Sequence, residues 1–262
     1  TWERVKAWQE RTLSALFVVL FIDAVHIKVR RENGVATVAL YVVYGITTQG
    51  QREIVALYPG QGAESATEWG RCLQDLKRRG LQDALIICSD GLSGLKPVIA
   101  EAFPLARIQR CVVHKIRNCF KLMDNKDSKE ILRQLRSVYM AVNEPAARLA
   151  LEDFDRHWDG KYKVITNMWE KDWTELMACM DLPESLRKIT YTTNAIENLN
   201  REIRRVTKTK SAWVSDRALL IQLFLSLERS KKSWNKKVHN WANVRRDLIE
   251  LFGERFSNHI DQ

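Results

Sequence analysis

The stretch Leu16–Arg30 reads LFVVLFIDAVHIKVR and decides the fold. Its first seven residues are all apolar and mostly β-branched or aromatic, which is typical of a strand buried on both faces. Asp23 interrupts this run, and the residues after it alternate between apolar and polar, so one strand face turns towards solvent. A carboxylate at this position has a large desolvation cost unless a cation or a hydrogen-bond network meets it. Asp23 is therefore either a functional acid or a core acid paired with a nearby arginine.

The bulk composition is that of an ordinary globular protein. The chain has 262 residues, of which 45% are apolar and 28% are charged, so it can form one large domain or two small ones. The longest apolar run, Ala15–Ile22, is too short to cross a bilayer, and the polar N-terminus has no signal-peptide character. The five cysteines contain no C-x-x-C pair. We therefore expect a cytoplasmic protein with no disulfide framework and no membrane partner.

The positive charge is unevenly distributed along the chain. The formal net charge is +10, and the segment from Glu197 to Lys237 holds eleven Lys and Arg against four Asp and Glu. Such a patch favours a polyanionic partner, first nucleic acid and then an anionic membrane surface. A solvated basic helix face is an equally good interpretation of the charge alone.

The first half of the chain alternates between predicted strands and helices. A helix over residues 1–14 leads into the first strand, and Asn33-Gly34 marks a hairpin turn to the second. Strands are expected at 16–30, 35–46, 52–58, 84–88 and 106–113. Amphipathic helices are expected between the later strands, at 65–79 and 93–103.

Only helices are predicted after the fifth strand. They cover 116–123, 129–142, 145–158 and 162–180, then a connector spans 183–193, and further helices follow at 194–206, 215–227 and 241–252. A meander followed by strand–helix alternation predicts an α/β fold with a mixed sheet. This order is that of a ribonuclease-H-like core with an all-α insertion before the last core helix. We divide the chain into 1–114, the first part of the core; 115–190, the helical insertion; and 191–262, the helices that complete the core.

A second carboxylate, Asp90, follows the apolar strand 84–88. Functional groups gather where the strands of open α/β sheets end, but Asp-Gly is also a common structural turn. If the first and fourth strands are neighbours, Asp23 and Asp90 face each other and repel unless a cation holds them. Mg²⁺ prefers one or two carboxylates together with water and phosphate oxygens.

The third candidate, Glu197, lies near the start of a predicted helix. With Asn194 it forms a capping-box arrangement, which would make it structural. An apolar stripe consisting of Ile196, Leu199, Ile203 and Val206 would dock this helix on the core. Glu197 lies beside that stripe and shares a face with Arg201, Arg204 and Lys208. The spacing therefore also allows an acid that holds a metal beside a phosphodiester backbone.

One Cys/His pair, Cys111-x-x-His114, resembles half of a zinc site. The chain contains no second well-spaced pair, so a structural zinc is not the expected role. We expect His114 to lie beside the acidic residues instead.

Four blocks together resemble one family of enzymes. They are FIDAVHIKVR, SDGLSGL, QRCVVHKIRN and YTTNAIENLNREIRR. In this order and spacing, from about Leu16 to Phe252, they are similar to the Mutator-type transposases of bacterial insertion sequences, the IS256 family of the DDE superfamily. The resemblance implies a ribonuclease-H-like core with an all-helical insertion between the second Asp and the Glu. It maps the catalytic, metal-binding triad onto Asp23, Asp90 and Glu197, and the family's Cys-x-x-His signature onto Cys111 and His114.

The resemblance also implies a chemistry and its partners. Two Mg²⁺ ions, for which Mn²⁺ can substitute, would activate water to cleave the element's end and then direct the freed 3′-OH into target DNA. The implied partners are terminal inverted repeats, target DNA and further copies of the chain in a synaptic complex, at the bacterial nucleoid. Phosphate contacts would come from the basic series Arg201, Arg204, Arg205, Lys208 and Lys210.

Two other functions stay open at this point. Members of the family carry a sizeable N-terminal region before this core, whereas about fifteen residues precede the first strand here. We therefore expect a fragment or a truncated copy, which could persist as a catalytically silent DNA-binding remnant. A nuclease of the ribonuclease-H type is the third possibility, and it would cleave DNA without joining it.

Overall fold

A computed structural model describes residues 1–191 and 194–260, without the side chains of residues 194–197 and 233. Five strands form one mixed sheet in the order β3-β2-β1-β4-β5. Their bounds are Leu16–Arg31 (β1), Gly34–Thr47 (β2), Arg52–Pro59 (β3), Asp83–Ser89 (β4) and Arg107–Arg110 (β5). Neighbours within β1–β3 are antiparallel, and β4 lies parallel to both β1 and β5. This arrangement confirms the predicted α/β class with a ribonuclease-H-like mixed sheet.

Helices cover both faces of the sheet and extend the molecule beyond one edge. Three lie in the first part of the chain: Trp2–Glu10 (α1), Ala66–Arg78 (α2) and Leu95–Ala102 (α3). The middle of the chain forms Val112–Cys119 (α4), Ser128–Tyr139 (α5), Glu144–His157 (α6), Lys163–Lys171 (α7), Trp173–Leu176 (α8) and Glu184–Tyr191 (α9). The last part forms Asn194–Thr207 (α10), Asp216–Arg229 (α11), Lys231–Trp234 (α12), Trp241–Phe252 (α13) and Glu254–Ser257 (α14).

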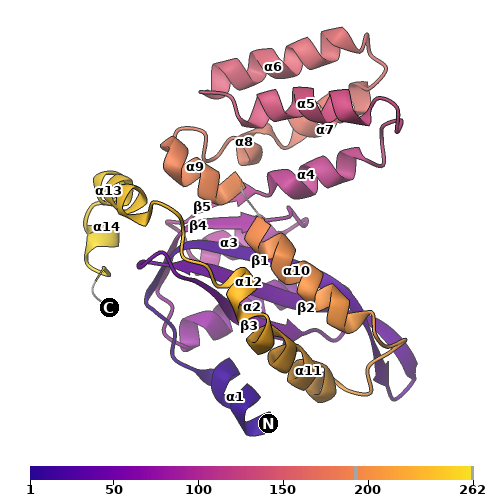
Figure 1. The fold of residues 1–262 in the computed structure, drawn as a ribbon, viewed down its shortest axis with the longest axis vertical. Helices are drawn as coiled ribbons and strands as arrows, with labels where there is room; N and C mark the ends of the chain where they lie inside the picture. Colours follow the sequence, from indigo (N-terminus) through magenta and orange to yellow (C-terminus); the bar gives the residue numbers. More distant parts are fainter. Residues whose placement is uncertain (192–193, 261–262) are drawn as a thin grey trace.

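The sheet is the middle layer of three. Helices α2 and α3 bury their apolar stripes on one face, against Phe17, Leu20 and Ile22 of β1. Helices α10 and α11 cover the opposite face, which holds Val19 and Phe21 (Figure 1). Because successive residues of a strand point to opposite faces, Asp23 points towards the α10 side.

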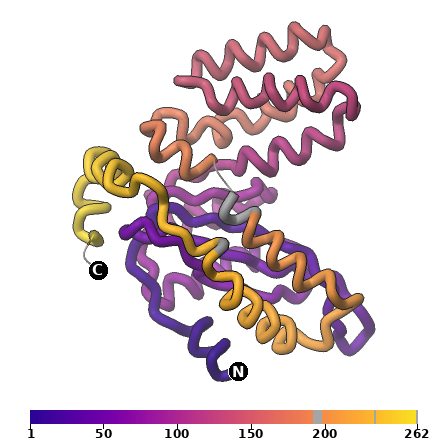
Figure 2. The backbone as a smooth tube through the Cα atoms, viewed as in Figure 1, coloured from indigo at the N-terminus to yellow at the C-terminus, as the bar shows by residue number. Residues whose placement is uncertain are grey.

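The helical block stands beyond the β5 edge of the sheet, as the backbone trace also shows (Figure 2). It has an apolar core of its own, in which Ile131, Leu135, Phe154, Ile165 and Trp169 are almost completely buried. All residues of this core lie between positions 112 and 191. The block therefore packs largely on itself, and α4 and α9 connect it to the sheet.

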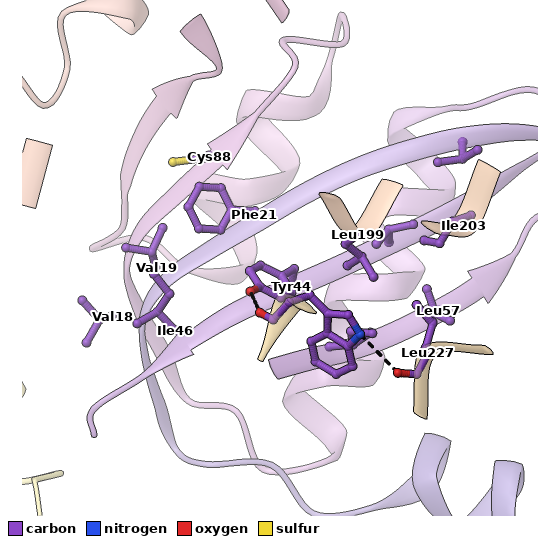
Figure 3. Close-up of a cluster of buried hydrophobic side chains, with 14 of the residues drawn as sticks. Val18, Val19, Phe21, Tyr44, Ile46, Leu57, Cys88, Leu199, Ile203 and Leu227 are labelled. Carbon is purple, nitrogen blue, oxygen red and sulfur yellow. Dashed lines mark hydrogen bonds between the residues drawn. The ribbon is translucent and has the colours of Figure 1, made fainter. Parts of the chain in front are cut away.

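Helix α10 is anchored on the sheet by an apolar stripe. Leu199 and Ile203 are fully buried and lie over β1 and β2 in the cluster that Figure 3 shows. The same cluster contains two buried hydrogen bonds. Tyr44 Oη donates to the carbonyl oxygen of Trp234 at 2.6 Å, and Trp234 Nε1 donates to that of Leu227 at 3.2 Å. The apolar contacts place α10 over β1, the strand that carries Asp23, and the hydrogen bonds tie α11 and α12 to β2.

Three predicted boundaries are wrong. The fifth strand ends at Arg110 because Val112 turns inward and begins α4 in the core of the helical block. The helix expected at 162–180 is broken at Asp172 into α7 and α8. The expected connector 183–193 contains α9, whose Leu186 and Ile189 join the core beneath α10. In the part of the chain that the structure describes, no helix combines the length and apolar composition needed to cross a bilayer.

Candidate active site

The register of two parallel strands brings two carboxylates together. β1 pairs with β4 up to Phe21 and Cys88, and β4 ends one residue later at Ser89. Continuing the same register places Asp90 opposite Asp23. The sheet opens at this point, because β1 continues to Arg31 while the chain after β4 turns away into a loop. The two acids that the sequence singled out therefore lie side by side where a parallel strand ends.

Asp23 is buried, with 5% of its surface exposed. Its Oδ1 accepts a hydrogen bond from the backbone N–H of Ala24 at 2.8 Å, and its Oδ2 accepts one from Asn200 Nδ2. His114 Nε2 lies 3.8 Å from Oδ1. Burial raises the pKa of Asp23, the positive field of His114 opposes this shift, and the negative charge of Asp90 adds to it. Among the described side chains, no Lys or Arg pairs with this carboxylate.

Asp90 belongs to a tight loop with a defined shape. Its Oδ1 accepts a hydrogen bond from the Leu92 N–H at 3.2 Å, so it has the structural turn role that an Asp-Gly sequence suggests. Gly91 has a φ of +85°, and a Cβ at this position would overlap the guanidinium group of Arg110. Arg110 Nη2 donates to the carbonyl oxygen of Gly91 at 3.1 Å. Arg110 therefore holds the Asp90 loop in place, and only a glycine at position 91 leaves room for its guanidinium group.

The helical block holds that arginine in turn. Arg110 Nη1 contacts Asp172 Oδ1 at 3.0 Å and Glu175 Oε2 at 3.3 Å, and Lys115 also pairs with Asp172. Lys115 is buried, and its burial lowers its pKa although Asp172 opposes the shift. These groups line a cavity of about 410 Å³ that reaches Asp90. The network ties the Asp90 loop to α7 and α8, so the insertion supports the site, and its acids Asp172 and Glu175 are paired with Arg110 and Lys115.

The third acid of the predicted triad lies outside the described side chains. Glu197 belongs to α10, but nothing can be said of how its carboxylate is placed. Three residues further along, Asn200 reaches Asp23 from the same helix. Sequence reasoning missed Asn200, and the only signal for it was its place between the apolar stripe and the basic face.

The basic face of α10 forms one wall of a groove. Arg201, Arg204, Arg205 and Lys208 line it together with Arg117 of α4, and its volume is about 370 Å³. Arg205 is paired with Glu202 of the same helix at 3.2 Å. Lys210 is placed elsewhere, with its Nζ 4.7 Å from the ring centroid of Trp213. The structure therefore brings four of the five predicted basic residues together and adds Arg117, which sequence reasoning missed.

The two residues of the Cys-x-x-His pair make different contacts. Cys111 precedes α4, and its backbone N–H donates to the carbonyl oxygen of Ser89 at 2.7 Å, which ties the end of β4 to the start of the helix. One turn later, His114 reaches Asp23. The pair thus links the end of β4 to the middle of β1, with the histidine beside Asp23.

A further acid, Glu64, lies on the opposite side of the Asp90 loop. Its Oε1 accepts a hydrogen bond from Trp69 Nε1 at 2.8 Å, and the next helix packs Ala66 against Gly94 of that loop. Burial raises the pKa of Glu64 to about 7, and the negative charges of Asp90 and Asp23 contribute to the shift. No sequence pattern indicated Glu64, because its loop meets the site only through the fold.

Comparison with known proteins decides the family. The family described as "Transposase, Mutator family" matches residues 1–237. The chain belongs to the Mutator family of transposases. Its resemblance to this family, noted from four short blocks, thus extends over most of its length.

The similar curated proteins are transposases of bacterial insertion sequences. A probable transposase for an ISRM3-like element of Sinorhizobium fredii is 36% identical over 257 residues, and the transposase of ISRM3 of Rhizobium meliloti is 35% identical over the same length. Each alignment covers 98% of this chain but 64% of the relative. A probable transposase from Corynebacterium diphtheriae is 31% identical over 278 residues, which cover 98% of this chain and 81% of the relative.

The site of this Mutator-family chain has donors that suit a hard divalent cation. Asp23 and Asp90 are carboxylates, and the buried Asn200 Oδ1 has no hydrogen-bond partner in the described structure. Oxygen donors of this kind fit Mg²⁺. Within the described residues no three Asp, Glu, His or Cys side chains converge on one point. A metal here would therefore need a further ligand, for which Glu197 is the family's candidate.

The raised pKa of Glu64 predicts a pH-dependent stability. Its folded pKa of about 7 exceeds the reference value of 4.5, so the fold favours the protonated form. This contribution is complete below pH 4.5 and is lost as the pH rises through 7. We expect the unfolding free energy of the parent to fall between pH 5 and pH 8 in the presence of chelator. In the Glu64→Gln variant this fall should be smaller by about 2 kcal/mol. Guanidinium titrations at both pH values measure it, with Glu68→Gln as the matched control. A Glu64→Gln protein with the parent's pH dependence would contradict the assignment.

Proposed function

We propose that this chain is the catalytic part of a DDE transposase that cleaves DNA at the ends of an insertion sequence and joins them to target DNA. Asp23, Asp90 and Glu197 would hold Mg²⁺, and Mn²⁺ would substitute for it. The observation that carries the proposal is the proximity of Asp23 to Asp90 at the open end of β4, where no described Lys or Arg forms an ion pair with Asp23.

The site needs a cation for electrostatic reasons. Two neighbouring carboxylates repel each other unless positive charge meets them, and burial, together with the negative charge of Asp90, raises the pKa of Asp23. Bound Mg²⁺ would supply a Lewis acid that polarises the scissile phosphate and favours attack by water or by a 3′-OH. The chain itself orients Asp23 through Ala24 and Asn200 and fixes Asp90 through the Arg110 network.

The groove between α4 and α10 would hold the DNA backbone. Its lining side chains are all cationic, which suits phosphate oxygens and carries no base-edge readout by itself. Glu197 and the basic residues occupy one helix, so a backbone lying along α10 would pass the acidic site. The groove therefore accounts for positioning, while recognition of a particular end sequence requires contacts beyond it.

Removing the groove's charge should reduce the salt dependence of DNA binding. Each phosphate contact contributes about 0.9 to the slope of log affinity against log salt. We expect the triple change of Arg201, Arg204 and Lys208 to Ala to lower that slope by about 2 to 3, as measured by fluorescence anisotropy with a duplex at several salt concentrations. The matched control replaces the exposed Lys126, Lys129 and Arg136 of the helical block with Ala. Equal slopes for both triple variants would exclude this groove as the DNA surface.

Pre-cleaved DNA separates the proposed function from its alternatives. A duplex with a free 3′-OH at the element's end is incubated with a plasmid and Mg²⁺, and joined product is resolved on a gel. Joining by the parent protein supports the transposase. Cleavage of uncut duplex without any joining would favour a nuclease, and salt-sensitive binding without either reaction would favour a DNA-binding remnant.

A further inference from the structure

Asn200 is the polar residue of α10 that reaches the catalytic carboxylate. It is 97% buried, since only 3% of its surface is exposed, and its Nδ2 donates to Asp23 Oδ2. A buried amide with only one of its two polar atoms hydrogen-bonded lowers the stability of the fold, because the unpaired atom loses its hydration without compensation. Here the unpaired atom is Oδ1, which has no hydrogen-bond partner in the described structure.

The position of Asn200 on the helix explains why it can act on the site. Leu199 and Ile203 lie on the buried side of α10, and Arg204, one turn after Asn200, lines the basic groove. Asn200 therefore lies on the boundary between the face that docks on the sheet and the face that would follow DNA. The same helix turn that fixes the register of α10 on β1 also fixes the amide against Asp23.

The chemistry of the free oxygen points to a cation. An amide oxygen is a neutral hard donor, which suits Mg²⁺ or Mn²⁺ and adds no charge to an already acidic site. Polar groups that hold a ligating carboxylate in one orientation typically change metal affinity by 10- to 100-fold when they are removed. Asn200 can therefore orient Asp23 through its Nδ2 and offer a cation its Oδ1, which has no hydrogen-bond partner in the described structure.

We propose that Asn200 is a positioning residue for Asp23 and that its Oδ1 is an additional oxygen donor to the divalent cation of the site. This inference rests on the proposed metal-dependent function and extends it by one residue. It assigns to α10 two contributions to the site, one through Glu197 and one through Asn200.

Two substitutions with opposite expected effects test the inference. Asn200→Asp keeps an oxygen at the same place and adds a charge, so we expect the apparent Kd for Mn²⁺ to fall by about tenfold. Asn200→Leu has a similar size and no oxygen, so we expect this Kd to rise by about 10- to 100-fold. The readout is the Mn²⁺-dependent rise in melting temperature with a DNA duplex present, which does not depend on turnover.

Controls separate ligation from charge and from folding. Asn198→Asp adds the same charge two residues away and should change the Kd by less than twofold. Asn200→Leu removes the unsatisfied Oδ1 but also the donor to Asp23 Oδ2, so the two effects oppose each other and we expect the melting temperature without metal to stay close to the parent's. Because Asn200→Asp also removes the Nδ2 donor of Asp23, equal weakening of Mn²⁺ binding by the two variants would overturn the ligand role of Oδ1 and leave the positioning role. If neither variant changes the Kd, both roles are overturned, and in either case the proposed function stands. A parent protein that Mn²⁺ does not stabilise at all would overturn both the inference and the proposed function.

Discussion

Asp23→Asn should abolish strand cleavage and joining while making the metal-free protein more stable. The substitution removes a ligand and a charge from the reacting centre, so we expect the rate to fall by at least about 10³-fold. The same charge is buried beside Asp90, and its burial raises the pKa of Asp23. Neutralising it should therefore raise the unfolding free energy at pH 8 in chelator. If the Asn200 amide turns over, so that Oδ1 takes the place of Nδ2, the new amide nitrogen can donate to it.

The opposite signs of the two effects make this prediction specific. Loss of activity together with gain of stability cannot come from unfolding, and guanidinium titration beside a cleavage assay measures both. Asp75→Asn is the control, because Asp75 accepts a hydrogen bond from Tyr58 and is paired with Arg78, and its pKa is lowered. We expect that control to lose stability. A destabilised Asp23→Asn protein would show that Asp23 is a structural acid.

Gly91→Ala should damage both the fold and the site. Its φ of +85° disfavours any side chain, and a Cβ there would overlap the guanidinium of Arg110. Together these effects should lower the unfolding free energy by about 3 kcal/mol. Because Arg110 holds the loop that carries Asp90, we also expect cleavage to fall by about 10- to 100-fold under folding conditions.

Gly160→Ala is the matched control for that prediction. Gly160 has a φ of +76°, and no atom lies within 4 Å of the position that a Cβ would occupy. Its substitution therefore imposes the backbone penalty alone, about 1 kcal/mol, with no effect on cleavage. If the two variants lost equal stability and both kept full activity, Arg110 would not be the support of the Asp90 loop.

Much of the sheet was predictable because its strands carry strong local signals. The apolar run of β1, the Asn33-Gly34 turn and the apolar β4 each indicate a strand or a hairpin on their own. These local patterns do not show which strands pair with each other in the sheet. Asp23 and Asp90 meet because β1 pairs with β4. The sequence did not predict this pairing, and the proximity of the two acids was expected only if it formed.

The errors in the helical part have two physical origins. Residues 183–193 were predicted as a connector, whereas α9 begins directly after Pro183, and proline is favoured in a first helical turn. The break at Asp172 has no local signal, because Asp172 is fixed by Lys115 and Arg110 from distant elements. Tertiary contacts of this kind override local propensity.

The site was predictable only where a motif marked it. Asp23, Asp90, His114 and the basic residues of α10 stood in short blocks with clear chemistry. Asn200 and Arg117 lie within two of these blocks, but the pattern gave neither of them a role, and Glu64 lies outside all four; each is brought to the site by packing. Asn200 depends on the docking register of α10, Glu64 on the loop before α2, and Arg117 on the place of α4 beside α10.

The most direct test of the account replaces Asp90 with cysteine. A thiolate is a poor ligand for Mg²⁺ and a better one for Mn²⁺, so a metal-ligating position should show a metal-dependent rescue. We predict that Asp90→Cys is inactive in DNA cleavage and joining with Mg²⁺ and recovers both reactions with Mn²⁺, while Asp216→Cys behaves as the parent with either ion. Full activity of Asp90→Cys with Mg²⁺ would contradict the account, because Asp90 would then be a turn residue without a metal to hold.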